Sequence, residues 1–155
     1  MLKIRNIFLV IISFVVLLTL TGCMKKTVKN TSDFKSLSEK YNYTISDVTS
    51  QYSDKQKVKN ASVAKSSQDF QIEFFVLEDE GSAGIMFYKY KTTFESSKSG
   101  ATMQSSSSGE NYTTYSLTCN NKYMYLCRVD NTLLYVNIPS DYKDNVKKFV
   151  EELGY

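Results

Sequence analysis

The sequence predicts an α+β domain in which an antiparallel sheet of about five strands carries its helices on one face. Short runs rich in Val, Ile, Phe and Tyr alternate with turn residues, as in a sheet built from adjacent strands. Longer segments carry apolar residues at helical spacing. The expected order is helix, two strands, helix, three strands, helix: a β-hairpin, a three-stranded meander and the helices that cover them.

The first helix is expected near the start of the domain. Phe34, Leu37 and Tyr41 recur at helical spacing, and Ser32 and Asp33 before them can cap a first turn. The pattern is short, so it predicts a short helix.

A hairpin and the main core helix are expected next. Residues 42–57 are polar and ambiguous, whereas 58–65 and 70–77 are typical of two strands joined by a turn. Asp79 can then cap a helix. Its apolar positions follow a helical repeat: Ala83, Met86, Phe87, Tyr90 and Phe94.

The second half predicts a mobile loop, a meander and a last helix. Residues 95–110 are rich in serine and offer little apolar surface to offset the entropy lost on ordering. The meander is expected over residues 112–119, 123–129 and 132–138, with turns at 120–122 and 130–131. Pro139 ends the last strand and Ser140 can cap a helix. Its apolar stripe is Tyr142, Val146, Phe149, Val150 and Leu153.

The hydrophobic pattern predicts which face of the meander meets the helices. A three-residue turn at 120–122 would place Tyr115, Leu117 and Cys119 on one apolar face with Tyr123, Tyr125, Cys127 and Val129. The opposite face is the candidate interaction surface, with Tyr112, Met124, Leu126, Leu133 and Tyr135. The alternative is that the first helix or residues 42–57 cover this face and make it a second core.

No residue pattern indicates catalysis, a metal site or a bound cofactor. The chain has no histidine, the commonest general base. The acidic run of Glu78, Asp79 and Glu80 is best explained as the start of a helix, where acids complement the helix dipole. A carboxylate pair in this run is the alternative that an enzyme would need. Glycine-rich phosphate loops and zinc-type cysteine spacing are missing from the sequence.

A disulfide between Cys119 and Cys127 is not expected. In the predicted hairpin the two residues would lie about four positions apart along the strands, roughly 13 Å at about 3.3 Å per residue. A disulfide needs Cα atoms within roughly 7 Å. Both cysteines are therefore expected to be small core residues.

The N-terminus is typical of a secretory signal. Lys3 and Arg5 precede an apolar run over 7–20, and no acidic residue occurs in the first 22 positions. Leu20-Thr21-Gly22-Cys23 follows and resembles the lipobox of bacterial lipoproteins. The resemblance implies cleavage after Gly22, diacylglycerol on Cys23 and a location on the outer side of the cell membrane. An uncleaved anchor helix is the alternative, with the same compartment.

The resemblance divides the chain into a signal peptide over 1–22, a lipidated tether over 23–31 and one extracytoplasmic domain over 32–155. Loss of Lys3 and Arg5 leaves 17 basic against 16 acidic residues, so the formal charge falls from +3 to +1. Such a domain has no electrostatic footprint for nucleic acid. Lys25, Lys26 and Lys29 can either attract an anionic leaflet or serve as a solvated tether. The composition is similar to that of small lipoproteins of low-GC Gram-positive bacteria.

Three functions are compatible with these observations. The first is a non-enzymatic, lipid-anchored module that binds an envelope protein. The second is a receptor for a small ligand or a cell-wall glycan, and the third is an enzyme that uses carboxylates of residues 78–80. An uncovered apolar face favours the first two, and a concave pocket with convergent acids favours the third.

Overall fold

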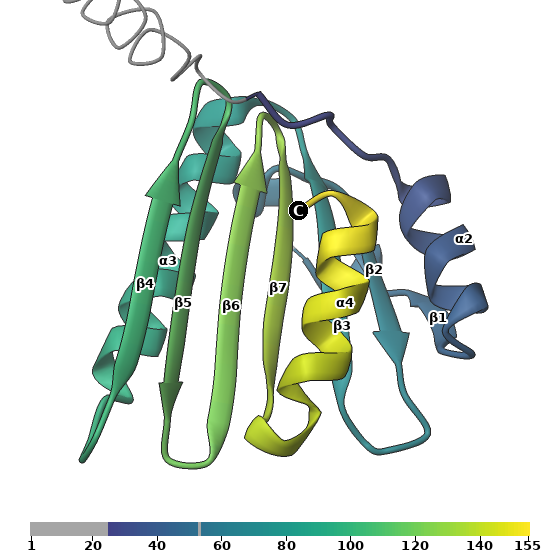
Figure 1. Ribbon diagram of the computed structural model, residues 1–155. Helices are drawn as coiled ribbons and strands as arrows, with labels where there is room; N and C mark the ends of the chain where they lie inside the picture. The colour runs from purple at the N-terminus through teal and green to yellow at the C-terminus, as the bar shows by residue number, and fades with distance from the viewer. Residues whose placement is uncertain (1–24, 53) are drawn as a thin grey trace, which may run out of the picture.

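A computed structural model describes residues 25–52 and 54–155 as one antiparallel sheet with helices on both faces (Figure 1). The sheet has seven strands in the order β1-β2-β3-β7-β6-β5-β4. The strands are β1 (Thr44–Asp47), β2 (Val58–Lys65), β3 (Gln71–Leu77), β4 (Met103–Ser108), β5 (Tyr112–Cys119), β6 (Lys122–Val129) and β7 (Thr132–Pro139). The α+β class is therefore confirmed, whereas the expectation of about five strands is wrong.

The helices of the described residues are α2 (Thr31–Lys40), α3 (Glu80–Ser96) and α4 (Lys143–Leu153). In Figure 1, α2 and α4 lie in front of the sheet and α3 lies behind it. Phe34, Phe74 and Phe149 belong to one buried cluster, whereas Phe75 and Phe94 belong to a second. The sheet is thus buried on both faces, and the expectation that all helices gather on one face is wrong.

The two strands that the sequence did not predict form the two edges of the sheet. β1 lies in the ambiguous segment and pairs with β2. β4 lies in the serine-rich segment expected to be a mobile loop, and every one of its residues is exposed while it pairs with β5. Pairing to a strand that is already fixed supplies backbone hydrogen bonds without apolar burial. An edge strand of this kind leaves no hydrophobic pattern in the sequence.

The hairpin between β5 and β6 corrects the expected register. Cys119 pairs with Lys122, so the turn holds only Asn120 and Asn121. Both asparagines have positive φ, 50° and 58°, as a two-residue type I′ turn requires. The shorter turn shifts β5 by one residue against β6. As a result, Tyr115, Leu117 and Cys119 face α3 together with Met124, Leu126 and Leu133.

The turn between β6 and β7 is as expected. Val129 pairs with Thr132, which leaves Asp130 and Asn131 in the turn. Cys127, Leu134 and Val136 therefore lie in the cluster under α2 and α4. Cys119 and Cys127 are free, and the two residues belong to different clusters on opposite faces of the sheet.

The helices keep their expected apolar faces, but two of the three caps differ. Asp79 caps α3 as expected, and its side chain accepts a hydrogen bond from the Ser82 amide at 2.7 Å. α2 is capped by Asn30, which forms a reciprocal capping box with Asp33. At the C-terminal end, Ser140 begins a short 3-10 turn before α4 and provides no side-chain cap.

The segment before α2 lies against the body of the domain. Asn111, which is buried, accepts a hydrogen bond from the Lys26 amide and donates one to the Lys26 carbonyl, both at 2.9 Å. The Lys26 ammonium donates to the Gly154 carbonyl at 3.0 Å and lies 5.3 Å from the Tyr112 ring centroid. The expected tether is therefore held to the domain from Lys26 onward. Gly22 and Cys23 lie outside the described residues.

Candidate functional site

The expected interaction surface is covered. Met124, Leu126 and Leu133 are buried beneath α3. Tyr112 is buried on the opposite face, and Tyr135 is half-buried against the α3 cluster. The prediction that these five residues form one free face is therefore wrong. Its physical cause is the one-residue register error in β5, together with the placement of α3.

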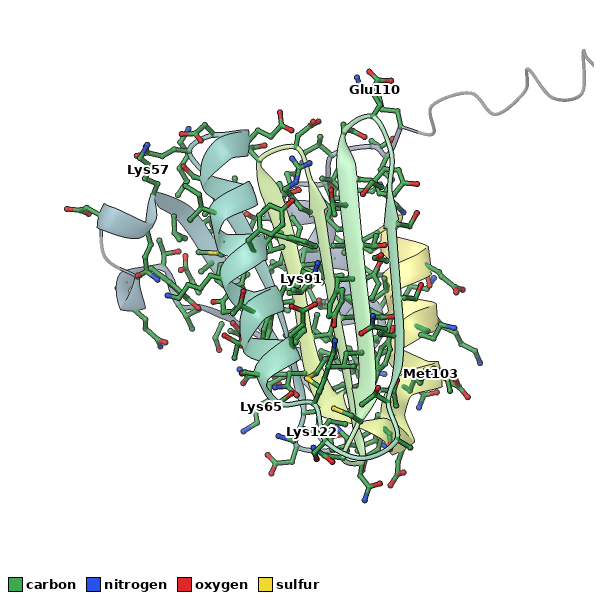
Figure 2. All side chains as sticks on the ribbon, turned by 90° about the vertical axis from the view of Figure 1, so that its left-hand side faces the viewer. Lys57, Lys65, Lys91, Met103, Glu110 and Lys122 are labelled. Carbon is green, nitrogen blue, oxygen red and sulfur yellow. The ribbon has the colours of Figure 1, made fainter. Side chains whose placement is uncertain are left out.

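One corner of the sheet face that carries α3 remains open. A hollow of about 340 Å³ lies where β2, β3 and β7 reach the same end of the sheet. We call it the Glu73 hollow; its lining residues are Lys65, Asp69, Phe70, Gln71, Glu73, Tyr135, Asn137 and Pro139. Lys65 lies at the lower end of the molecule in the view of Figure 2.

Strand alternation places the polar groups of the Glu73 hollow. Successive side chains of a strand point to opposite faces, so Gln71 and Glu73 share the α3 face with Phe75. Glu73 pairs across the strands with Tyr135, and Asn137 follows two residues later on the same face of β7. Two neighbouring strands thus bring one carboxyl group, two amides and one phenol together.

The Glu73 carboxyl group is half-buried and hydrogen-bonded but has no cationic partner within the described residues. Gln71 Nε2 donates to Glu73 Oε1 at 3.0 Å. Burial raises the pKa of Glu73, and hydrogen bonds from Gln71 and Tyr52 oppose this rise only in part. In the part of the chain that is described, every ion pair joins other residues, and Lys65 pairs with Asp69 at 3.6 Å.

Aromatic side chains make a packed wall next to Glu73. Tyr135 lies 4.7 Å from Tyr90 and 5.3 Å from Phe94 between ring centroids. Tyr52 directly follows the short 3-10 helix Thr49–Gln51. Its ring packs edge-on against Phe75, with 5.3 Å between the ring centroids. These contacts fix the rings, and with them the positions of the hydroxyl groups.

The tyrosine hydroxyls near Glu73 act as hydrogen-bonding groups at neutral pH. Burial raises the pKa of Tyr52, Tyr90 and Tyr135, and the negative charge of Glu73 raises all three further. A phenol with a raised pKa stays protonated and can donate a hydrogen bond. Asn137 Nδ2 already donates to the Tyr135 hydroxyl at 3.4 Å. The wall therefore suits recognition better than proton abstraction.

Two acids of the run that an enzyme would need, Asp79 and Glu80, are engaged in structural contacts. Asp79 caps α3 and pairs with Lys57 at 3.6 Å, and these contacts hold the pKa of Asp79 below its ordinary value. Glu80 pairs with Arg128 at 2.7 Å. Within residues 25–52 and 54–155, no group of three or more His, Cys, Asp or Glu side chains is placed to hold a metal ion.

The sequence contains a signal for the Glu73 hollow that the predictions did not use. In Gln71-Ile-Glu-Phe-Phe, polar and apolar residues alternate before the strand becomes wholly apolar. This alternation indicates a strand whose first part has one face open to solvent. Tyr52 and Asn137 come close to Glu73 only because of the order of the strands in the sheet, and no local sequence pattern predicts that order.

No protein-family model and no curated protein matches this chain. Among solved structures, the chain is similar to a GTP binding regulator from Thermotoga maritima, with 16% identity and a TM-score of 0.45 over 81% of this chain and 85% of that one. A likeness of this degree carries no argument about the activity of this chain. No helix of the described residues is long and apolar enough to cross a membrane.

Proposed function

We propose that this chain is a lipid-anchored, extracytoplasmic, non-enzymatic binding protein whose Glu73 hollow takes a small polar ligand with a protonated amine. The anchor and the compartment rest on the lipobox-like residues that end at Cys23. The binding role rests on the geometry around Glu73. The binding site would then lie in the Glu73 hollow and not on the sheet face that α3 covers.

The observation that carries the proposal is a half-buried carboxyl group that forms no ion pair within the described residues, in a hollow whose Lys65 is paired with Asp69. A carboxylate removed from water loses hydration energy, which a nearby positive charge can restore. Here burial raises the pKa of Glu73, and the hollow leaves the group open to a ligand. An ammonium group that enters the hollow would stabilise the charged carboxylate and displace little else.

The remaining groups favour a ligand that also carries hydroxyls. Gln71 and Asn137 offer amide donors and acceptors, and the Tyr135 hydroxyl offers both. The lining of the hollow is mostly polar, with Phe70, Tyr135 and Pro139 as its apolar part, so it suits a polar ligand. An amine-bearing sugar, free or at the end of a glycan, has the matching chemistry. Glucosamine is therefore a suitable probe.

The binding test uses the full-length protein in detergent and isothermal titration calorimetry with glucosamine. N-acetylglucosamine is the matched ligand without the positive charge. We expect glucosamine to bind, N-acetylglucosamine to bind at least ten-fold more weakly, and Glu73→Gln to remove the difference. Glu78→Gln is the control, because this exposed acid lies outside the hollow. Equal affinity for the two sugars in the wild type would refute the proposed ligand class.

The anchor is tested separately by mass spectrometry of the N-terminus. The full-length protein and a Cys23→Ala variant are expressed in a bacterium that processes lipoproteins. We expect a cleaved, diacylated Cys23 in the wild type and an unprocessed chain in the variant. An unmodified Cys23 in the wild type would contradict lipid anchoring and leave the binding test unaffected.

A further inference from the structure

The outer face of α3 is unusual for a solvated helix. We use this name for the stripe formed by Gly81, Gly84, Ile85, Tyr88 and Thr92. Ile85 is 75% exposed and Tyr88 is 64% exposed, although both are large apolar side chains. Figure 2 shows α3 outside the sheet, and Gln56 and Lys57 border Ile85 on one side of the helix in a hollow of about 250 Å³. The stripe contains no charged residue.

The packing of residues 25–52 and 54–155 does not explain the glycine at position 84. A Cβ added to Gly84 would meet no atom within 4 Å, so the fold of one copy does not require a glycine there. A glycine inside a helix weakens it relative to alanine. Glycine in such a place is useful where another backbone approaches closely. Within the described residues no backbone approaches Gly84 in this way.

The outer face of α3 is complementary to a second copy of itself that runs in the opposite direction. Its small residues would then lie opposite its large ones. Gly81 and Tyr88 lie at equal distances along the helix from the midpoint between Gly84 and Ile85. Both residues, with Gly84, border a hollow of about 420 Å³. If a second α3 runs antiparallel across this midpoint, each Tyr88 lies over the Gly81 of the other copy and enters that hollow.

The charges on the β5–β6 side of α3 fit the same arrangement. Glu80 lies on that side, where it pairs with Arg128, and Lys91 lies there too, 5.2 Å above the Tyr115 ring. An antiparallel pair brings the acidic first turn of one helix beside Lys91 of the other. The helix dipoles also oppose each other in this arrangement.

We propose that two copies of this chain associate through an antiparallel contact between their α3 helices, centred on the step from Gly84 to Ile85. The contact is isologous, as expected for a two-fold dimer. α3 has 17 residues, so it is about 25 Å long, and a single helix pair of this length buries less than a permanent interface. The dimer is therefore weak and reversible. This inference goes beyond the proposed function and does not depend on the Glu73 hollow.

Disulfide cross-linking tests the contact directly. In the full-length protein, Gly84→Cys is expected to form a covalent dimer under mild oxidation, because the two positions meet at the centre of the pair. Thr93→Cys is the matched control; it is exposed on the same helix but lies away from the outer face of α3. Failure of Gly84→Cys to cross-link faster than Thr93→Cys would overturn the proposal.

Gly84→Ala provides a second test, because it should raise the stability of the single copy and weaken self-association. The added methyl group meets nothing within one copy, so the variant is expected to unfold at higher urea concentration than the wild type. The same methyl group occupies the line of closest approach, so self-association measured by sedimentation should weaken about ten-fold. A wild-type protein that stays monomeric at every concentration, or a Gly84→Ala variant that associates as well as the wild type, would contradict the dimer.

Discussion

Burial raises the pKa of the Glu73 carboxyl group, whereas hydrogen bonds lower the pKa of Asp47, Asp79 and Glu152. The Glu73 carboxyl group sits on the α3 face of β3, half-buried, with Gln71 and Tyr52 as hydrogen-bonding neighbours. These neighbours donate to the carboxylate without neutralising it. A group in this state reduces the stability of the empty protein and increases its affinity for a cation. Binding sites commonly show this trade between stability and function.

Glu73→Gln is predicted to stabilise the empty protein at neutral pH. The folded-state pKa of Glu73 is raised above its ordinary value by burial, so the folded state holds a proton that the unfolded state has lost at intermediate pH. The free energy of unfolding therefore falls as pH rises from the pKa of Glu73 in the unfolded state to its higher pKa in the folded state. Above both values the charged carboxylate destabilises the folded protein. We expect the variant to gain on the order of 1 kcal/mol at pH 7, and little in acid, where both states are protonated.

Urea unfolding followed by circular dichroism at pH 7 and in acid measures this difference. Glu78→Gln is again the control, because Glu78 is exposed and is expected to change little at either pH. A Glu73→Gln variant that is less stable than the wild type at pH 7 would show that the carboxylate already has a compensating partner in the empty protein.

Asn111 is a buried residue that helps to hold the N-terminal segment against the domain. Its side chain is buried and bonds the Lys26 backbone twice, and its amide also donates to Asp130 at 3.0 Å. Asn111→Ala leaves the part-buried amide and carbonyl of Lys26 without these partners, a loss of roughly 1 kcal/mol. We expect faster tryptic cleavage around Lys26 and Lys29, read by mass spectrometry. Asn145→Ala on the exposed face of α4 is the control, and equal cleavage of both variants would be inconsistent with the clamp.

At the scale of single elements, the turn between β5 and β6 decides which side chains are buried. Asn120 and Asn121 both adopt the left-handed conformation. Asn121→Gly should stabilise the domain by about 0.5 kcal/mol, because glycine adopts this conformation without a steric penalty. Asn121→Val should destabilise it by about 1–2 kcal/mol. Thermal unfolding measures both, and the reverse order would indicate the three-residue turn.

The sheet face under α3 is a core and not a docking surface, and one pair of variants tests this. Leu133 is fully buried, so Leu133→Asp is expected to cost more than about 4 kcal/mol and to prevent folding. Ile85→Asp places the same charge on the outer face of α3, where it should change stability by less than about 0.5 kcal/mol. Circular dichroism of the two variants separates them. A folded Leu133→Asp protein would mean that α3 does not cover this face.

The elements with a strong hydrophobic period could be predicted from the sequence, and those fixed by their neighbours could not. α3 and α4 have apolar positions at helical spacing, and most of the predicted positions are buried; Tyr90 is partly buried, and the partly buried Tyr142 precedes α4. β4 has no apolar period, because it is an edge strand held by β5 alone. The register of β5 against β6 depends on the length of the turn between them. The predicted three-residue turn, one residue longer than the actual turn, assigned the side chains of β5 to the wrong faces relative to β6.

At the scale of the whole molecule, the sheet separates two cores, and the candidate site lies where one of them ends. α2 and α4 cover one face, and α3 covers most of the other (Figure 1). The Glu73 hollow occupies the corner that α3 leaves open. The sequence could have indicated its β3 side from the alternation around Glu73. Its β7 side could not be foreseen, because β3 and β7 are neighbours only through a crossover of the chain.

The N-terminal contacts also orient the molecule relative to a membrane. If Cys23 carries lipid, only Met24 and Lys25 separate it from the clamped residue Lys26. Lys25 pairs with Glu110 in the turn between β4 and β5, at the upper end of the molecule in Figure 2. Lys65, at the Glu73 hollow, lies at the lower end in that view. The proposed anchor would thus hold the hollow away from the bilayer.

The most direct test of this account is an NMR titration of the Glu73 carboxyl carbon, with and without glucosamine, in the full-length protein. The account predicts a pKa above the ordinary glutamate value in the empty protein, because the group is half-buried and forms no ion pair within the described residues. It also predicts that glucosamine lowers this pKa, since an ammonium group beside the carboxylate favours its charged form. An ordinary pKa in the empty protein, or one that glucosamine leaves unchanged, would contradict the proposed site.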